Sequence, residues 1–369
     1  MMVKRRIVIK VGTSTLTGGT AHLDIPRMTD LVRQMAAVVS SGERLILVSS
    51  GAIAAGKEML NFPELPGNIP AKQMLAAIGQ PRLMNLYEQL FANYKLKIAQ
   101  VLLTREDISN RQRYLNARNT LELLLSYPIV PVINENDTVA VEEICIGDND
   151  NLSALVANLV EADLLVLLTD QPGLLSMDPC LSQTAQLIHE INTVHIPEKL
   201  WQAAGGSANG LGTGGMLTKL QAAEIARRSG TQVVIAQGSE KDILQRIVAG
   251  EKLGTWISPT TDKLESRKRF LLASANRIGS ITIDEGALQA MRKGGSLLPV
   301  GVRNVEGDFE HGDCVQIILV GGRRSALGLV NYSAKEIGVI KGHRSSEIED
   351  LLGYTYAEEI VHHNNMTFI

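Results

Sequence analysis

The sequence predicts a doubly wound α/β fold with a mainly parallel sheet, followed by a smaller β-rich domain. Up to about residue 259, short apolar runs alternate with helical patterns. This order is typical of parallel strands joined by right-handed helical crossovers. The chain has 369 residues, which is too many for one ordinary domain. Its composition also changes near residue 259, where a second domain is expected to follow.

Runs with the composition of buried strands recur through this first region. They are short, rich in β-branched residues and apolar on both faces, as is typical of central parallel strands covered by helices. The runs span 6–12, 44–51, 97–103, 129–135, 163–170 and 231–238. Between two of them, Leu152, Leu155, Val156 and Leu159 have the spacing of one helix face.

The region beyond residue 259 has a different character. The stretch "SPTTDKLESRKRF" is polar, basic and interrupted by proline, so residues 260–276 are predicted to form a linker. Beyond the linker, short strand patterns, glycine-rich turns and one short helix predict a small β-rich domain.

Composition and charge argue against several classes of protein. Hydrophobic residues make up 45% of the chain and aromatic residues only 4%, as in a soluble protein with aliphatic cores. The net charge of −3 provides no general attraction to nucleic acid or to anionic membranes. Cys145, Cys180 and Cys314 are isolated, which argues against a disulfide framework or structural zinc and fits a reducing cytoplasm. No apolar stretch approaches the ~18 residues of a membrane helix, and the N-terminal run is too short for a signal peptide.

Ligands of such sheets bind at the carboxyl ends of the strands, so the residues there are the first candidates. The first strand carries Lys10 and ends at Gly12. A buried lysine needs an anionic partner, and glycine lets backbone N–H groups approach a phosphate. The alternative is an edge-strand lysine that reaches water. Ser50 and Gly51 follow the second strand, either as an anion site or as an ordinary serine cap.

The most glycine-dense stretch, "SANGLGTGGMLTKLQAAEIARR", leads into a helix with Lys219 in its first turn. A lysine in that position opposes the helix macrodipole, and a bound polyphosphate would outweigh the penalty. The alternative is a flexible surface loop before an exposed lysine. Thr169 and Asp170 precede a Pro-Gly turn, which on these residues alone favours an ordinary turn over a nucleotide contact.

Carboxylates and amides are concentrated between residues 132 and 160. They are Asn134, Asn136, Asp137, Asp148, Asn149 and Asp150. Helix capping by Asp150 or Asn151 would explain one or two of them, but not all. Carboxylates can bind an ammonium group and amides can bind a carboxylate, which are the two charged groups of an amino acid. An aspartate can also hold two lysines in place, or help to bind Mg²⁺ with nucleotide phosphates.

These stretches resemble the motifs of the amino acid kinase family, and within it most closely those of the members that phosphorylate glutamate. The matching blocks are "VIKVGTSTLT", "VSSGAIAAG", "VPVINENDTVA", "IGDNDNLSALVA", "LLTDQPGL" and "GLGTGGMLTKLQAA". The resemblance runs over nearly the whole chain and implies the amino acid kinase fold for residues 1–259. Residues 277–355 resemble a PUA domain, which leaves 356–369 as a C-terminal tail.

The resemblance also implies roles for the matching residues. Lys10 and Lys219 would flank the transferring phosphoryl group, and Asp150 would orient both lysines. Backbone N–H groups at Gly12 and Gly51 would face the phosphoryl oxygens. The implied glutamate ligands are Ser50, Asp137 and Asn149, with Asn134 and Asp148 nearby. The implied ATP ligands are Lys10, Thr169, Asp170, Thr213, Gly214, Gly215, Met216, Leu217, Thr218 and Lys219. A small polar residue is more usual at the position of Leu217 in the last block, and a position in the first turn of a helix is expected to tolerate the leucine.

The implied reaction transfers the γ-phosphate of ATP to the side-chain carboxylate of glutamate, with Mg²⁺ as cofactor and no metal ligand assigned in the chain. A carboxylate is already ionised at pH 7, so the reaction needs no general base. The lack of histidine in the motifs agrees with this chemistry. The resemblance further implies a step of proline biosynthesis, feedback inhibition by proline and a cytoplasmic homo-oligomer.

Other functions fit the sequence less well. A related kinase could act on acetylglutamate, aspartate or carbamate, but the acidic and amide cluster favours a substrate with a free ammonium group. RNA binding by the PUA-like region is disfavoured, because residues 277–369 hold 9 Lys and Arg against 12 Asp and Glu. The basic cluster at 267–269 in the linker keeps that alternative open. A dinucleotide-dependent oxidoreductase would need GxGxxG after the first strand, and the chain lacks it there.

Overall fold

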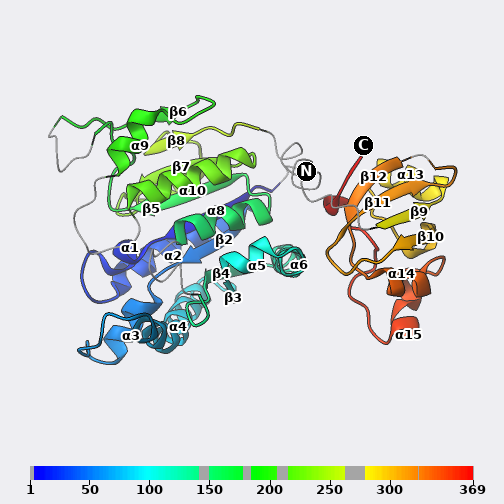
Figure 1. The fold of residues 1–369 in the computed structure, drawn as a ribbon. Coiled ribbons are helices and arrows are strands. Elements are labelled where there is room, and N and C mark those ends of the chain that lie inside the picture. The colour runs from blue at the N-terminus through cyan, green and yellow to red at the C-terminus, as the bar shows by residue number, and fades with distance from the viewer. Residues whose placement is uncertain are drawn as a thin grey trace. The chain divides into compact units, whose positions relative to one another are not determined.

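The computed structural model describes residues 4–140, 149–177, 184–205, 215–261, 279–322 and 324–368 (Figure 1). The chain divides into two compact units. The first comprises Met1–Ser109 and Asn116–Asp262, and the second comprises Asn110–Leu115 and Lys263–Ile369. Across the described ranges, no helix is both long enough and apolar enough to cross a membrane.

The first unit is built on an eight-stranded sheet with the order β3-β4-β2-β1-β5-β7-β8-β6 (Figure 1). Its strands are β1 (Arg6–Val11), β2 (Arg44–Ser49), β3 (Lys97–Leu103), β4 (Ile129–Glu135), β5 (Leu164–Thr169), β6 (Glu190–Ile191), β7 (Gln232–Gln237) and β8 (Thr255–Ile257). Parallel pairing runs from β3 through β4, β2, β1 and β5 to β7. β8 is antiparallel to β7 and parallel to β6. The predicted mainly parallel, doubly wound sheet is therefore confirmed.

Helices connect these strands and cover both faces of the sheet (Figure 1). They are α1 (Thr13–Thr17), α2 (Ile25–Ser40), α3 (Ala52–Met59), α4 (Ile69–Ala92), α5 (Arg105–Ser109), α6 (Arg111–Ser126), α8 (Asn149–Leu159), α9 (Glu198–Ala204), α10 (Met216–Arg228) and α11 (Ile243–Val248). The expected helix containing Leu152 to Leu159 is present as α8.

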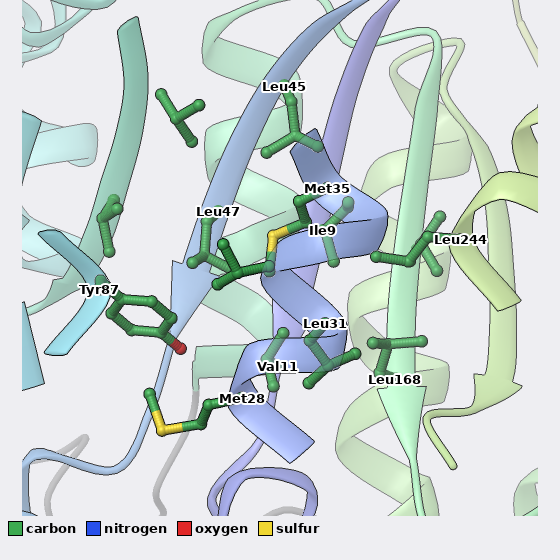
Figure 2. Packing of buried hydrophobic residues seen from close by; sticks show 14 of the residues in the cluster. Ile9, Val11, Met28, Leu31, Met35, Leu45, Leu47, Tyr87, Leu168 and Leu244 are labelled. Atoms are coloured by element: carbon green, nitrogen blue, oxygen red, sulfur yellow. The ribbon is translucent and has the colours of Figure 1, made fainter. Parts of the chain in front are cut away.

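The main apolar core lies between the sheet and the helices α2, α4 and α11. Figure 2 shows Met35 of α2 beside Ile9 of β1, and Leu31 of α2 beside Val11 of β1. Because side chains alternate along a strand, the residue between Ile9 and Val11 points to the opposite face of the sheet. That residue is Lys10, and α8 and α10 cover the face toward which it points (Figure 1).

The strand at 97–103 differs from its prediction. A central position was expected, but β3 is the edge strand of this sheet. Lys97 and Gln100 are exposed, and only Leu103 at the end of the strand is buried. β3 pairs with β4 on one side, so among the described strands the apolar residues of this run have a neighbour on that side alone.

Strand register brings the predicted site segments to one edge of the sheet. Val11 at the end of β1 pairs with Ser49 of β2 and with Leu168 of β5. Thr169 pairs with Gln237, and Asn134 lies at the corresponding end of β4. The carboxyl ends of these parallel strands therefore share one edge, and the strand order reverses beside β1, where ligands of such sheets bind.

The second unit contains a five-stranded sheet with the order β10-β9-β11-β12-β13. Its strands are β9 (Gly279–Ile283), β10 (Val302–Gly307), β11 (Cys314–Leu319), β12 (Arg324–Leu329) and β13 (Met366–Phe368). β9 and β11 are parallel, and the other pairs are antiparallel. The expected β-rich domain is present. The expectation of one short helix is wrong, because α14 (Ala334–Ile340) and α15 (Ile348–Leu352) join α13 (Glu285–Arg292) and bury Ile337, Ile340 and Ile348 in its core.

Candidate active site

Two lysines from distant parts of the chain meet one buried carboxylate. Lys10 Nζ of β1 lies 2.6 Å from Asp150 Oδ1, and Lys219 Nζ of α10 lies 3.2 Å from Asp150 Oδ2. The exposed fractions of Lys10, Asp150 and Lys219 are 3%, 0% and 5%. Buried charges are stable only when they are paired in this way. The structure therefore brings together the three residues that were predicted to act on the phosphoryl group, and their catalytic roles stay predictions.

Each member of this cluster is positioned by its own secondary-structure element. Lys10 lies on the face of β1 opposite the α2 core, and β1 is flanked by β2 and β5. The alternative of an edge-strand lysine reaching water is therefore wrong. Asp150 is the second residue of α8, and Lys219 lies in the first turn of α10. The alternative of an exposed lysine after a surface loop is also wrong, because Lys219 is buried.

Helix capping does not explain Asp150. α8 begins at Asn149, so neither Asp150 nor Asn151 precedes the helix, and the prediction that one of them caps it is wrong. The Asp150 carboxylate instead binds the two lysines and accepts a hydrogen bond from the Thr218 hydroxyl at 2.7 Å. Thr218 was predicted as an ATP ligand, and here it helps to hold the carboxylate at the start of α10.

The electrostatics of the cluster keep Asp150 ionised. Burial alone would raise the pKa of the Asp150 carboxyl, because the charged form loses its solvation. The ammonium groups of Lys10 and Lys219 outweigh burial and, with hydrogen bonds from Lys10 and Thr218, hold this pKa well below its ordinary value of 3.8. Asp150 therefore carries its negative charge throughout the physiological range and offsets the repulsion between the two lysines.

A chain of amides lies next to this cluster. Asn149 Nδ2 donates to Ser50 Oγ at 2.9 Å, to Asn134 Oδ1 at 3.0 Å and to the Ser49 carbonyl oxygen at 3.2 Å. Asn134 Nδ2 in turn donates to Gln80 Oε1 at 2.8 Å. Three of the predicted substrate ligands, Ser50, Asn134 and Asn149, are thus linked directly.

Asp137 and Asp148 are the two remaining predicted substrate residues. Asp137 is half-buried in the turn that follows β4. Asp148 lies outside the described residues.

Glycines leave room beside the lysine cluster and the serines. Gly51 has φ +101°, a conformation that favours glycine, and it precedes α3 without a side-chain cap. The alternative of an ordinary serine cap at this helix is therefore wrong, and Ser50 Oγ accepts from Asn149 instead. A Cβ atom on Gly12 would lie 3.2 Å from Lys10 Nζ, so a side chain there would crowd the ammonium group.

The predicted nucleotide residues follow β5 and begin α10. Thr169 is buried, and its hydroxyl donates to Asp170 Oδ1 at 3.0 Å. Asp170 itself is exposed. At the start of α10, Gly215 is the N-cap, Met216 is half-buried and Leu217 is 37% exposed. The predicted residues Thr213 and Gly214 lie outside the described part of the chain.

Sequence reasoning missed two buried polar residues of α4. Gln80 binds Asn134, and the Tyr87 hydroxyl lies 2.8 Å from Ser49 Oγ. Burial raises the pKa of Tyr87 despite the hydrogen bond to Ser49, so Tyr87 is neutral. Gln80 follows the apolar helical run "MLAAIG" directly, and an amide at the end of that run is a signal that could have identified it.

Comparison with known proteins agrees with this geometry. The model of the amino acid kinase family matches residues 5–237. The chain belongs to the amino acid kinase family. A PUA domain model matches residues 279–352 of this amino acid kinase, within the second unit.

Relatives of this amino acid kinase match along nearly its entire length. Glutamate 5-kinase of Sodalis glossinidius is 51% identical over 367 residues, which cover 99% of each chain. Glutamate 5-kinase of Deinococcus radiodurans is 52% identical over 365 residues, which cover 99% of this chain and 100% of that one. The solved carbamate kinase from Giardia lamblia bound to AMP-PNP has a TM-score of 0.51 at 15% identity, covering 70% of this chain and 99% of that one. The last likeness shows the fold alone.

Proposed function

We propose that this kinase transfers the γ-phosphoryl group of ATP to the side-chain carboxylate of L-glutamate, giving L-glutamyl 5-phosphate and ADP. The observation that carries the proposal is the placement of Lys10 and Lys219 on opposite oxygens of Asp150, at the carboxyl edge of the sheet. The names of its full-length relatives support glutamate as the acceptor. The reaction is the first step of proline biosynthesis.

The chemistry requires little beyond positioning and charge. A glutamate carboxylate oxygen attacks the γ-phosphorus, and the bond from that phosphorus to the β,γ-bridging oxygen breaks, with its electrons leaving on ADP. The nucleophile is already ionised near neutral pH, so no side chain has to remove a proton. Negative charge on the equatorial oxygens is the main obstacle, and preorganised donors in a water-poor site stabilise it most effectively. Lys10 and Lys219 are those donors, with backbone N–H groups of Gly12 and Gly51.

Asp150 has an indirect role in this scheme. Without a carboxylate between them, two buried ammonium groups would repel each other and move apart. By binding one lysine on each oxygen, Asp150 fixes the separation and direction of both Nζ atoms before substrates arrive. Thr218 restrains the same carboxylate. This is preorganisation of the kind that electrostatic catalysis needs.

The amino-acid substrate is assigned to the neighbouring amide chain. Ser50 and Asn149 provide a hydroxyl and an amide group that are hydrogen-bonded to each other, and Asn149 directly precedes Asp150 of the lysine cluster. Asp137 provides a carboxylate for the substrate ammonium group. Asn134 helps to hold Asn149 in place, because Asn134 Oδ1 accepts a hydrogen bond from Asn149 Nδ2. Thr169, Asp170 and the start of α10 from Gly215 to Lys219 are assigned to ATP, with the predicted Thr213 and Gly214.

Magnesium is proposed as the ion that ATP carries. Within the described ranges, no group of three or more histidine, cysteine, aspartate or glutamate side chains could hold a metal ion. The Asp150 carboxylate is occupied by two lysines and a threonine. These residues do not fit a metal site built by the protein, so no step is assigned to a protein-bound ion. Mg²⁺ commonly binds through substrate phosphates in this way.

A panel of acceptors tests the proposal. ADP release is measured with ATP, Mg²⁺ and either glutamate, aspartate, N-acetylglutamate or carbamate, with hydroxylamine present to trap acyl phosphates as hydroxamates. Turnover and hydroxamate formation with glutamate are expected. Turnover only with another acceptor would keep the lysine chemistry and change the substrate. No turnover with any acceptor would refute the proposal.

Regulation and assembly extend the proposal. Proline, the product of the pathway, is proposed to inhibit by competing for the glutamate pocket, and the enzyme is proposed to be a cytoplasmic homo-oligomer. Competitive inhibition predicts that proline raises the KM for glutamate and leaves kcat unchanged. Sedimentation velocity of the purified chain reports its oligomeric state.

RNA binding by the second unit is not expected. Salt-dependent retention of RNA by the whole chain would contradict this expectation.

A further inference from the structure

Gln80 is a buried polar side chain that has no assigned role in substrate binding or catalysis. It lies on α4, where its neighbours Leu83 and Tyr87 pack into the main core, and it is only 9% exposed. Its Oε1 atom accepts a hydrogen bond from Asn134 Nδ2 at 2.8 Å. Buried amides are kept in cores when their hydrogen bonds serve a specific arrangement.

Backbone groups determine how this amide chain is oriented. The Glu135 backbone N–H can only donate, and it donates to Asn134 Oδ1 at 2.9 Å. The Nδ2 group of Asn134 must therefore point the other way, toward Gln80 Oε1. Asn149 Nδ2 donates both to Asn134 Oδ1 and to the Ser49 carbonyl oxygen, which can only accept. The direction of every hydrogen bond from Gln80 to Asn149 follows from these two backbone groups.

Close helix packing fixes where Gln80 stands. A Cβ atom on the preceding residue, Gly79, would lie 1.8 Å from the Ala52 carbonyl oxygen and 2.4 Å from the Gly56 backbone nitrogen. α4 therefore rests directly on the backbone of α3, the helix that begins just after Ser50 and Gly51. Because α4 and α3 are in backbone contact, Gln80 on α4 can move little relative to Ser50 and Gly51, which precede α3.

We propose that Gln80 is a positioning residue for the amino-acid substrate and acts through Asn134. Gln80 accepts the hydrogen bond of Asn134 Nδ2 and so orients Asn134 Oδ1 toward the Asn149 amide. Asn149 Nδ2 donates to that oxygen, which keeps it in hydrogen-bonding distance of Ser50 Oγ. The inference rests on the proposed assignment of Ser50 and Asn149 to the amino acid. Gln80 touches neither Thr169 nor the start of α10 through any of these bonds, so ATP binding is independent of it.

The test compares Gln80→Met, which keeps the length of the side chain and removes the acceptor, with Gln89→Met. Gln89 lies on the same helix, is exposed and bonds only to Asn85 among the hydrogen bonds of the described residues. The acceptor panel is run first on the wild-type enzyme, and its best amino-acid substrate is used throughout. We expect Gln80→Met to raise the KM for that amino acid about 10-fold, as loss of one buried hydrogen bond would. The KM for ATP should stay within about twofold, and Gln89→Met should match the wild type.

A double-mutant cycle then separates positioning from general packing. If Gln80 acts through Asn134, adding Gln80→Met to Asn134→Ala should not raise the amino-acid KM further. Additive effects would overturn the inference, as would an unchanged amino-acid KM in Gln80→Met, or equal rises in the KM for ATP and amino acid. Failure of the proposed function is seen separately, because it appears in the wild-type acceptor panel.

Discussion

Lys10 and Lys219 bind opposite oxygens of the same carboxylate. One lysine comes from the first strand and the other from a helix near the end of the first unit, and Asp150 joins them at 2.6 and 3.2 Å. The arrangement places two positive charges beside each other inside a protein, which is unfavourable unless a function or a fixed anion requires it. Asp150 provides the anion, and a transferring phosphoryl group would provide the function.

Removing Lys219 should reduce catalysis without unfolding the enzyme. Lys219→Ala is expected to lower kcat on the order of 10²–10³-fold, by analogy with the loss of one preorganised donor. Steady-state ADP release measures this, with circular dichroism as the check on folding. Gln221→Ala, at an exposed position of the same helix, is the matched control and should keep normal kcat. A folded Lys219→Ala enzyme with near-normal kcat would contradict the role given to this lysine.

Neutralising Asp150 should destabilise the first unit. Asp150→Asn keeps the shape of the side chain but leaves two buried ammonium groups without a counter-charge. We expect a loss of about 3–5 kcal/mol in the free energy of unfolding, measured by urea denaturation.

The whole cluster provides the control for that prediction. Replacing all three members by apolar residues, as Lys10→Met, Asp150→Leu and Lys219→Met together, removes the unpaired charges as well as the pair. This triple variant should lose less stability than Asp150→Asn, although it should be inactive. Equal stability of Asp150→Asn and wild type would show that the ion cluster is not a structural requirement.

The stability provided by Asp150 should depend on pH only in acid. Its folded pKa lies below the ordinary value of 3.8, so unfolding is accompanied by proton uptake as the pH falls toward that value and below it. The stabilisation relative to Asp150→Asn should be constant above about pH 5 and should shrink as the pH falls from there toward the folded pKa. Urea unfolding of both proteins from pH 3 to 7 measures the difference. A difference that grows in acid would have the wrong sign for a carboxylate stabilised by cations.

Backbone contact between α3 and α4 should make Gly79 intolerant of any side chain. Gly79→Ala places a methyl group 1.8 Å from the Ala52 carbonyl oxygen, so the helices must separate. We expect a loss of about 1–3 kcal/mol or more in the free energy of unfolding. Gly67→Ala is the control, because a Cβ atom there meets nothing within 4 Å, and it should change stability by less than about 0.5 kcal/mol. A neutral Gly79→Ala would mean that the two helices do not pack this closely.

Much of the first unit could be predicted from local patterns. The β-branched runs and the apolar spacing of α8 identify strands and helix because period and composition act over a few residues. Lys10 was a reasonable site candidate for the same reason, since a lysine within an apolar run needs an anion. The edge position of β3 could not be predicted in this way, because strand order depends on pairing between segments far apart in the chain.

The site could be predicted only in part. Local spacing did not indicate that Asp150 would pair with Lys10 and Lys219, because that contact joins three distant segments, and only the resemblance to a family implied it. Capping was a plausible role for Asp150 at the start of a helix, and it was wrong because the carboxylate points to the lysines. Gln80 was missed because a single glutamine in a helix is more often a surface residue.

The most direct test of the central claim follows the oxygen atom that forms the new bond. Glutamate labelled with ¹⁸O in its side-chain carboxylate is incubated with enzyme, ATP and Mg²⁺, and hydroxylamine converts the product to the hydroxamate and inorganic phosphate. Because hydroxylamine attacks the carbonyl carbon, the released phosphate keeps the carboxylate oxygen that attacked phosphorus. Mass spectrometry should find one ¹⁸O in the phosphate for each hydroxamate formed. Unlabelled phosphate would show that water, and not the glutamate carboxylate, receives the phosphoryl group.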